Sequence, residues 1–302
     1  MTDIEHDNLD AAARAAARAE ALVVILLLAV LALGAYFRLV GLDWDAGSHL
    51  HPDERFLTIV AGKISGVENP LDYLRTSRST LNPYNFGESF YVYGNLPMTV
   101  VRYAAEWMAG VCDFAADVAG APLAWCQRVY TGYDGIQLVG RALSALVDLV
   151  SILFTFLIGR RLYSAWAGLF AALLLAVAVM PIQQSHFFTM DNWATVFTTL
   201  ALYAAVRAAS LGDAEPRWRL RWWALFGLAL GLAAASRINM APLALVINVS
   251  AVIWVARRGA GVQGSGGAGE SVARRSPLVV QPRDLERALI GIALAAIVSI
   301  LT

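Results

Sequence analysis

Apolar residues in this sequence gather into long runs that are separated by short polar turns. The first run covers residues 21–40, and five more lie within residues 138–256, at about 138–158, 165–183, 193–209, 222–235 and 241–256. A bilayer-spanning helix needs roughly 20 mostly apolar residues, so these runs predict transmembrane helices. Residues 288–302 are apolar but too short to span at about 1.5 Å per residue. We expect them to begin a further transmembrane helix, truncated here, of a longer protein.

Residues 41–137 follow a different pattern, rich in Pro, Asn, Gly, Asp and aromatic residues. The least polar part, residues 91–111, contains Pro97, Arg102 and Glu106. Charged side chains are costly at the centre of a bilayer, so this part is expected to be an amphipathic helix lying on the membrane surface. The predicted fold is therefore all-α: a polytopic transmembrane helix bundle whose large first loop carries surface helices and an acidic pair.

The arginines give the predicted bundle an orientation. With residues 1–20 in the cytoplasm, the turn at Arg160 and Arg161, the loop between Arg207 and Arg221, and the Gly/Ser/Arg-rich loop 257–287 all fall inside. The two outer turns after the third and fifth runs carry a single Arg between them. This arrangement satisfies the positive-inside rule. It places residues 41–137 on the non-cytoplasmic side and predicts a multi-pass protein of the plasma membrane.

Composition agrees with a membrane protein and excludes one class of partner. The chain has 302 residues, of which 58% are hydrophobic and 15% charged, and its mean hydropathy is +0.58. The 23 basic and 23 acidic residues give a formal net charge of zero, so no nucleic-acid partner is indicated. The two cysteines, Cys112 and Cys126, fall on the outer side, where a disulfide is permitted, and two free thiols are an equal alternative.

Several reactive side chains are predicted to meet at the outer face. The first loop contains the segment HPDER at residues 51–55, the second outer turn returns His186 and Asp191, and the third adds Arg237. Transfer of a group from a lipid-linked phosphate needs a carboxylate base and cations that offset the charge on the leaving phosphate. Asp53 or Glu54 and Arg237 are candidates for these roles, and the helix bundle can offer a groove for the lipid.

Structural explanations compete with each of these assignments. The HPDER segment can be a solvated loop, Asp191 can cap a helix, and Arg237 can anchor a helix end at the headgroups. His49 and His51 can ligate a divalent metal with a carboxylate, but their spacing does not favour a metal site over surface histidines. Arg141 and Asp148 share a face of the second span and can form a polar contact between helices.

The order of these motifs resembles a known superfamily. An acidic-pair loop follows the first span, a later span ends in GRRLY at residues 159–163, a Pro-containing span exits into SHFFTMD at residues 185–191, and a Gly-rich span ends in SR at residues 236–237. The whole chain resembles the amino-terminal half of glycosyltransferase-C enzymes, in particular protein O-mannosyltransferases and bacterial aminoarabinose transferases. It is most similar to the prokaryotic family 39 glycosyltransferases.

The resemblance implies an activity and a set of site residues. It implies an inverting sugar transfer from a polyprenyl-phosphate-linked donor at the outer face, with no required cofactor. Asp53 would be the base, with Glu54 and Asp191 as further catalytic carboxylates. The residues expected to bind the donor phosphate or substrate are Arg237, which stands where the family often has Lys, and His186, Arg55, Tyr93 and Asn95.

Two other functions remain open at this stage. A transporter or lipid flippase would use ionisable residues deep within spans, for which Asp148 and Arg141 qualify. A membrane scaffold would bind a partner through its outer loop and would tolerate neutralisation of the HPDER carboxylates. The sequence names neither the sugar nor the acceptor.

Overall fold

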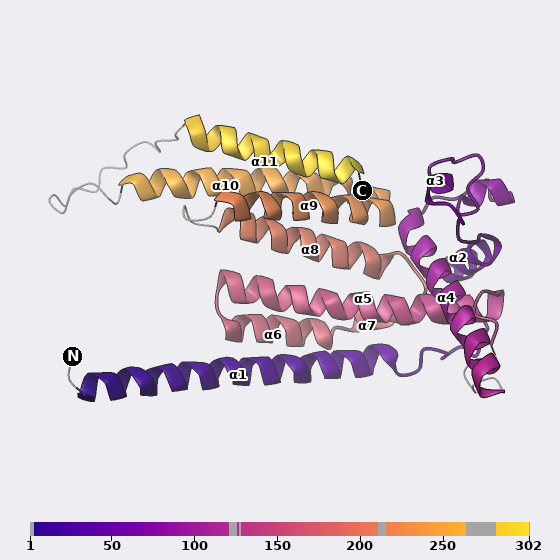
Figure 1. Cartoon of the computed structure of the whole chain (residues 1–302), viewed down its shortest axis with the longest axis horizontal. Coiled ribbons are helices and arrows are strands. Elements are labelled where there is room, and N and C mark those ends of the chain that lie inside the picture. Colours follow the sequence, from indigo (N-terminus) through magenta and orange to yellow (C-terminus); the bar gives the residue numbers. More distant parts are fainter. Residues whose placement is uncertain (1–2, 121–125, 127, 211–215, 264–281, 302) are drawn as a thin grey trace.

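The computed structural model describes residues 3–120, 126, 128–210, 216–263 and 282–301, and this part of the chain contains helices and no strands. Figure 1 shows an elongated bundle of side-by-side helices, with a smaller group of helices beyond one end. The bundle comprises α1 (Asp3–Leu39), α5 (Tyr133–Leu162), α6 (Ala165–Ala176), α7 (Val179–Ser185), α8 (Asp191–Ala209), α9 (Pro216–Ser236), α10 (Ala244–Gln263) and α11 (Pro282–Leu301). The smaller group, which we call the cap, comprises α2 (Pro52–Lys63), α3 (Pro70–Tyr73), η1 (Pro83–Phe86) and α4 (Asn95–Ala119).

Several helices of the bundle are long and apolar enough to cross a bilayer. Among the described residues, three helices are long and apolar enough by themselves: Ala11–Leu39 within α1, Tyr133–Leu162, and Ile238–Arg257, which joins η3 (Ile238–Leu243) to α10. The bent pair α6 and α7 makes a fourth candidate. The protein is therefore an all-α, multi-pass membrane protein, as the hydropathy pattern predicts. Most of the predicted loop 257–287 lies outside the described residues, which resume with α11.

The predicted span over residues 165–183 is bent rather than straight. Its two helices, α6 and α7, meet at an angle of 56°. Pro181 explains the break, because it has no N–H to bond the Val177 carbonyl and its ring crowds that turn. Arg38 from α1 donates to two carbonyls beside the break, those of Ala176 at 2.8 Å and Leu175 at 3.1 Å.

A buried ion pair accompanies this break. Arg38 also donates from Nε to Asp148 Oδ2 at 2.6 Å, and neither side chain is exposed to solvent. The pair joins α1 to α5, so the charge that occupies the α6–α7 break is neutralised inside the bundle.

Small residues let the bundle helices approach closely. A Cβ added to Gly168 in α6 would lie 2.5 Å from the Phe156 carbonyl oxygen of α5. Gly227, the first member of the GxxxG pair in α9, packs against α11, where an added Cβ would lie 2.2 Å from the Ala295 carbonyl oxygen.

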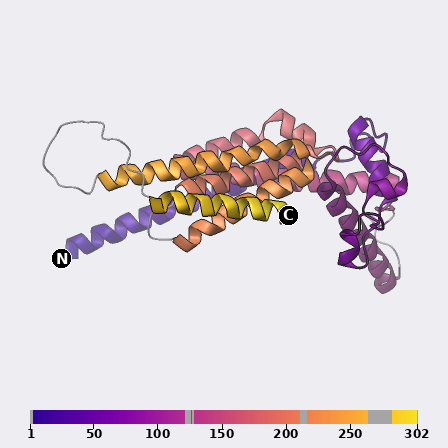
Figure 2. The same cartoon turned by 90° about the horizontal axis from the view of Figure 1, so that it is seen from above.

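The cap packs onto the end of the bundle through its own core. In Figures 1 and 2, α4 runs across the direction of the bundle helices. Its buried side joins α2, the start of α5 and the loop after α7 in one hydrophobic cluster that includes Leu57, Val60, Met98, Ile136 and Phe188. A disulfide between Cys112 and Cys126, with Cα atoms 5.4 Å apart, ties α4 to the segment before α5. The cysteines are thus bonded, which settles the choice that the sequence left open.

Candidate active site between cap and bundle

Local sequence signals position the acidic pair at the start of α2. His51 precedes the helix, and its Nδ1 accepts a hydrogen bond from the Glu54 N–H at 3.4 Å. Pro52 follows at the first helical position, where its missing N–H costs nothing. Asp53 and Glu54 therefore lie in the first turn of α2, where the helix dipole favours negative charge.

The two neighbouring carboxylates have opposite surroundings. Glu54 is completely buried, and Arg141 of α5 donates to both of its oxygens, at 2.7 Å and 2.6 Å. The backbone N–H of Phe188 donates to the same carboxylate at 2.8 Å. Asp53, by contrast, is exposed. Glu54 thus has no free oxygen facing solvent, whereas Asp53 does.

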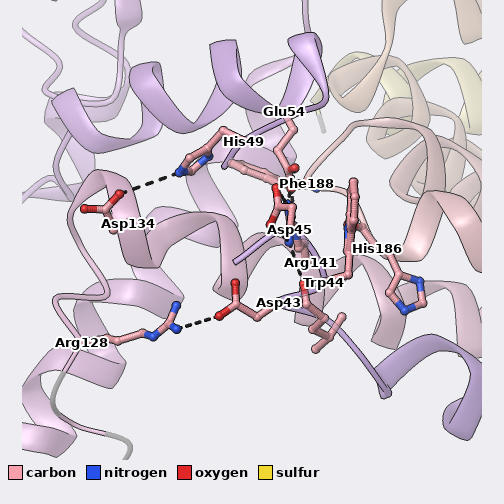
Figure 3. Close-up of polar contacts among 11 residues, drawn as sticks. Asp43, Trp44, Asp45, His49, Glu54, Arg128, Asp134, Arg141, His186 and Phe188 are labelled. Atoms are coloured by element: carbon pink, nitrogen blue, oxygen red, sulfur yellow. Dashed lines mark hydrogen bonds and ion pairs between the residues drawn. The ribbon is translucent and has the colours of Figure 1, made fainter. Parts of the chain in front are cut away.

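Arg141 joins the first loop to the bundle. Besides Glu54, its guanidinium binds the buried Asp45 at 2.9 Å and 3.0 Å and the Leu42 carbonyl at 2.7 Å, as Figure 3 shows for the charged groups. These hydrogen bonds lower the pKa of Asp45 to about 2, although burial opposes the shift. Arg141 and Asp148 share α5 and make polar contacts between helices, as the sequence allowed: Arg141 binds Glu54 of α2, and Asp148 binds Arg38 of α1.

Asp53 shares its surroundings with three other predicted site residues. Burial raises the pKa of the Tyr93 phenol above its ordinary value, and the charge and hydrogen bond of Asp53 raise it further. Asp191 adds to this rise and Arg237 opposes it. Arg237 and Asp191 also form a direct ion pair between the end of α9 and the start of α8. Asp53, Asp191 and Arg237 therefore all lie near enough to Tyr93 to influence its pKa.

A close backbone contact brings Tyr93 to this position. The N–H of Gly94 donates to the Ser236 carbonyl at 3.2 Å. A Cβ on Gly94 would lie only 1.9 Å from the Ala235 carbonyl oxygen, so no other residue fits without moving α4 or α9. Asn95 follows as the first residue of α4 and is half-buried.

Aromatic side chains form one wall of the candidate site. The rings of Phe56, Tyr91 and Tyr93 have centroids 6.0–6.2 Å apart. The Tyr84 hydroxyl supports this wall by donating to the Tyr91 carbonyl at 3.0 Å. The sequence reasoning missed Phe56, although its position three residues after Asp53 on one helix was a usable signal, because such residues share a helix face.

The remaining predicted residues are engaged with backbone or packing. The ring nitrogens of His186 face the carbonyls of Ile182 at 2.8 Å and Val40 at 2.9 Å. Arg55 is exposed and donates from Nε to the His49 carbonyl at 3.1 Å. The His51 ring packs on Phe187 at 4.4 Å. Within the described ranges, no group of three or more His, Cys, Asp or Glu side chains is arranged to hold a metal ion.

Comparisons with known proteins bear on this geometry. Residues 123–261 match the family model described as dolichyl-phosphate-mannose-protein mannosyltransferase. A search of curated proteins finds no match to the chain.

Two solved structures share the fold. The chain aligns with a protein of the Saccharomyces cerevisiae protein O-mannosyltransferase Pmt1–Pmt2 complex bound to the sugar donor, with a TM-score of 0.59 and 15% identity over 92% of this chain. It also aligns with the Archaeoglobus fulgidus oligosaccharyltransferase in the apo form, with a TM-score of 0.50 and 14% identity over 92% of this chain. The chain spans about a third of these proteins, 32% and 33% of their lengths.

The helical bundle and these comparisons show which class of fold the chain has. The chain is a multi-pass membrane protein with the glycosyltransferase-C fold, which confirms the resemblance drawn from the motif order. Within that fold, residues 123–261 are similar to the protein mannosyltransferases.

Proposed function

We propose that this chain forms the membrane-embedded part of an inverting glycosyltransferase that takes a sugar from a polyprenyl-phosphate-linked donor at the non-cytoplasmic face. The observation that carries the proposal is the cluster of Asp53, Tyr93, Asp191 and Arg237 between cap and bundle. The mannosyltransferase family model and the yeast neighbour, which is bound to its sugar donor, support the same reaction class.

Asp53 is the proposed base. Its carboxylate is exposed next to Tyr93, so an acceptor hydroxyl can reach it and lose a proton as the sugar–phosphate bond breaks. Direct attack of that hydroxyl on the anomeric carbon inverts its configuration, and the phosphate leaves with the bonding electron pair. Tyr93 is protonated at neutral pH, as any tyrosine with an ordinary or raised pKa is, and it can donate to Asp53 or to the substrate.

Arg237 is the proposed partner of the departing phosphate. Its side chain is 41% exposed while it pairs with Asp191, so part of the guanidinium faces the open side of the site. A guanidinium can bind two phosphate oxygens at once, which stabilises the charge that develops there. Arg55, exposed two residues after Asp53, is a second cation for the same phosphate. The ring nitrogens of His186 face backbone carbonyls, and its role in substrate binding stays a prediction.

Glu54 and Arg141 are proposed as positioning residues and not reacting ones. Their buried pairing fixes the first turn of α2, and hence Asp53, against α5 and the Phe188 backbone. The proposal requires no metal ion. A role for His49 and His51 as divalent-metal ligands stays a prediction, as do the plasma-membrane location, the cytoplasmic amino terminus and the prokaryotic origin.

The alternative of a transporter or flippase depends on Asp148 and Arg141. Asp148 is paired with Arg38, which also binds two carbonyls at the α6–α7 break, and Arg141 is fully used by the cap. Both residues thus have structural roles. Solute uptake that depends on Asp148, without glycosyl transfer, would favour transport.

The test is sugar transfer by the full-length protein with Asp53→Asn. Radiolabelled polyprenyl-phosphate sugars would be offered with membrane extracts as acceptors, and the anomeric configuration of the product would be read by NMR. We expect turnover to fall by at least about a hundredfold, the usual contribution of a general base. Asp72→Asn, an exposed carboxylate of α3 paired with Arg75, is the matched control. Unchanged turnover in Asp53→Asn would exclude Asp53 as the base.

A further inference from the structure

A polar cavity lies between the turn before α2 and the start of α5, formed by residues that the proposed active site does not use. Its volume is about 440 Å³, within the range of small-molecule sites. The turn at Ala46 and Gly47 forms one wall. The segment between the disulfide and the first turn of α5 forms the other, with Arg128, Val129, Gly132, Tyr133 and Asp134.

The second wall is held firmly in place. The Thr131 carbonyl accepts a hydrogen bond from Arg102 of α4 at 3.1 Å. Gly135 lies so close to the Val129 carbonyl oxygen that an added Cβ would be 2.4 Å away. The Cys112–Cys126 disulfide anchors the same segment to α4. The cavity is thus preformed, which favours a binding site over a packing gap.

A buried, unpartnered histidine points at this cavity wall. His49 is 2% exposed, and neither of its ring nitrogens makes a hydrogen bond. Its Nε2 faces Asp134 Oδ1 at 3.9 Å, and its ring packs against Tyr133 at 4.1 Å, as Figure 3 shows for the His49–Asp134 pair. A buried polar group without a partner is costly, so such groups are commonly satisfied by a bound molecule.

The backbone beside the cavity is also unusual. Ala46, with φ 46°, and His49, with φ 49°, are the two non-glycine residues with positive φ in the part of the chain that the structure describes. Residues held in this region are concentrated at functional sites. Ala46 lines the cavity, and His49 lies behind the wall with its ring toward Asp134.

The charges of the cavity select the chemistry of its ligand. Arg128 is already paired with Asp43 at 2.7 Å, a contact drawn in Figure 3, while the Asp134 side chain is 90% exposed. Because Arg128 is neutralised by Asp43, the exposed Asp134 carboxylate sets the charge of the cavity and disfavours an anionic ligand. A neutral polyol fits, since its hydroxyls can donate to the carboxylate and accept from the guanidinium while its carbon face packs on Tyr133.

We propose that this cavity is an accessory binding site for a neutral saccharide, with Asp134 and Arg128 binding its hydroxyls and Tyr133 packing on its ring. The site is separate from the Asp53 cluster, and its occupancy does not depend on the proposed transfer reaction. A hydroxyl that enters beside Asp134 would give the His49 imidazole the hydrogen-bond partner it lacks.

The test measures sugar binding and not catalysis. The protein would be placed in lipid nanodiscs, which avoids detergents with sugar headgroups. D-mannose, D-glucose and N-acetyl-D-glucosamine would then be offered singly in saturation-transfer difference NMR. We expect at least one of them to bind, and Asp134→Ala to weaken that binding by at least about tenfold, the loss expected for a hydrogen bond to a charged group.

Two control variants make the result specific. Asp117→Ala removes an equally exposed carboxylate from α4 and should leave binding unchanged. Asp53→Asn should also leave it unchanged, because Asp53 belongs to the other site. The proposal is overturned if none of the three sugars binds, if Asp134→Ala binds as well as the parent protein, or if only Asp53→Asn abolishes binding.

Discussion

Asp53 and Glu54 are chemically similar neighbours, yet the fold gives them different surroundings. Successive residues of a helix point about 100° apart, so the first turn of α2 sends one carboxylate to solvent and the other toward α5. Glu54 meets Arg141 there, and both side chains are 0% exposed. Substitution of Glu54 should therefore lower mainly the stability of the protein, and substitution of Asp53 mainly its activity.

Replacing Glu54→Gln is expected to destabilise the protein. The change leaves the buried Arg141 charge with one carboxylate, Asp45, in place of two, and disruption of a buried pair costs on the order of 3 kcal/mol. Thermal unfolding in detergent should show a lower Tm for Glu54→Gln than for Asp53→Asn, which removes an exposed charge. Equal Tm values for the two variants would contradict a positioning role for Glu54.

Tyr93 offers a spectroscopic measure of the site without substrate. Its pKa is raised by burial and by the negative charges of Asp53 and Asp191, so the phenol keeps its proton to higher pH than an ordinary tyrosine. Asp53→Asn removes one of these charges and should move the Tyr93 titration to lower pH. The absorbance of tyrosinate at alkaline pH, taken as a difference from Tyr93→Phe in each background, isolates this one residue. A titration unaffected by Asp53→Asn would mean that the two groups are not neighbours.

The same residues show what the sequence could and could not predict. The topology puts Asp53, Asp191 and Arg237 at one face, because their turns alternate with spans, and in the structure all three influence the pKa of Tyr93. Their catalytic roles stay predictions. The partners of Arg141 and Asp148 could not be predicted from the sequence, because helical spacing determines which residues share a face of α5 but not which element packs on that face. Arg141 pairs with Glu54, which is 87 residues away in the sequence, and Asp148 pairs with Arg38, which is 110 residues away.

At the scale of elements, the contact between α4 and α9 decides whether the site forms. Gly94→Ala is expected to disrupt it, since the new Cβ would lie 1.9 Å from the Ala235 carbonyl oxygen. The backbone of Gly94, with φ −71°, suits alanine, so the clash alone should cause the effect. We expect a lower Tm and loss of the raised Tyr93 pKa.

Gly110→Ala is the matched control in the same helix. An added Cβ meets nothing within 4 Å there, and alanine favours a helix interior by up to about 1 kcal/mol. Its Tm should equal or exceed that of the parent. If Gly94→Ala were as stable as Gly110→Ala, the close contact between α4 and α9 would not exist in solution.

The bend between α6 and α7 shows why the predicted element boundaries were only partly right. The hydropathy of residues 165–183 is that of one span, and hydropathy does not register a break. Pro181 signals that the helix is interrupted, but the stability of the break depends on Arg38, which arrives from α1. Such a partner is a tertiary feature that a local pattern does not contain.

At the scale of the whole molecule, composition and run length were sufficient to predict an all-α membrane bundle. Each span must satisfy its own backbone hydrogen bonds in lipid, which leaves helices as the solution for apolar runs of this length. The cap was harder to predict, because its core joins α2, α4 and α5 across long stretches of sequence. The sequence left a disulfide and two free thiols as equal alternatives. In the structure Cys112 and Cys126 are bonded, with Cα atoms 5.4 Å apart.

The orientation of the bundle is the last prediction, and the structure makes it directly testable. Both native cysteines are bonded to each other, so they should not react with a thiol reagent. Ser89→Cys places an exposed thiol on the cap, and Tyr163→Cys places one at the far end of α5, a helix about 45 Å long, where Tyr163 is 82% exposed. With Arg160 and Arg161 inside, a membrane-impermeant maleimide should label Ser89→Cys in intact cells and Tyr163→Cys only after permeabilisation. The reverse pattern would put Asp53 and Arg237 on the cytoplasmic side and would exclude sugar transfer at the outer face.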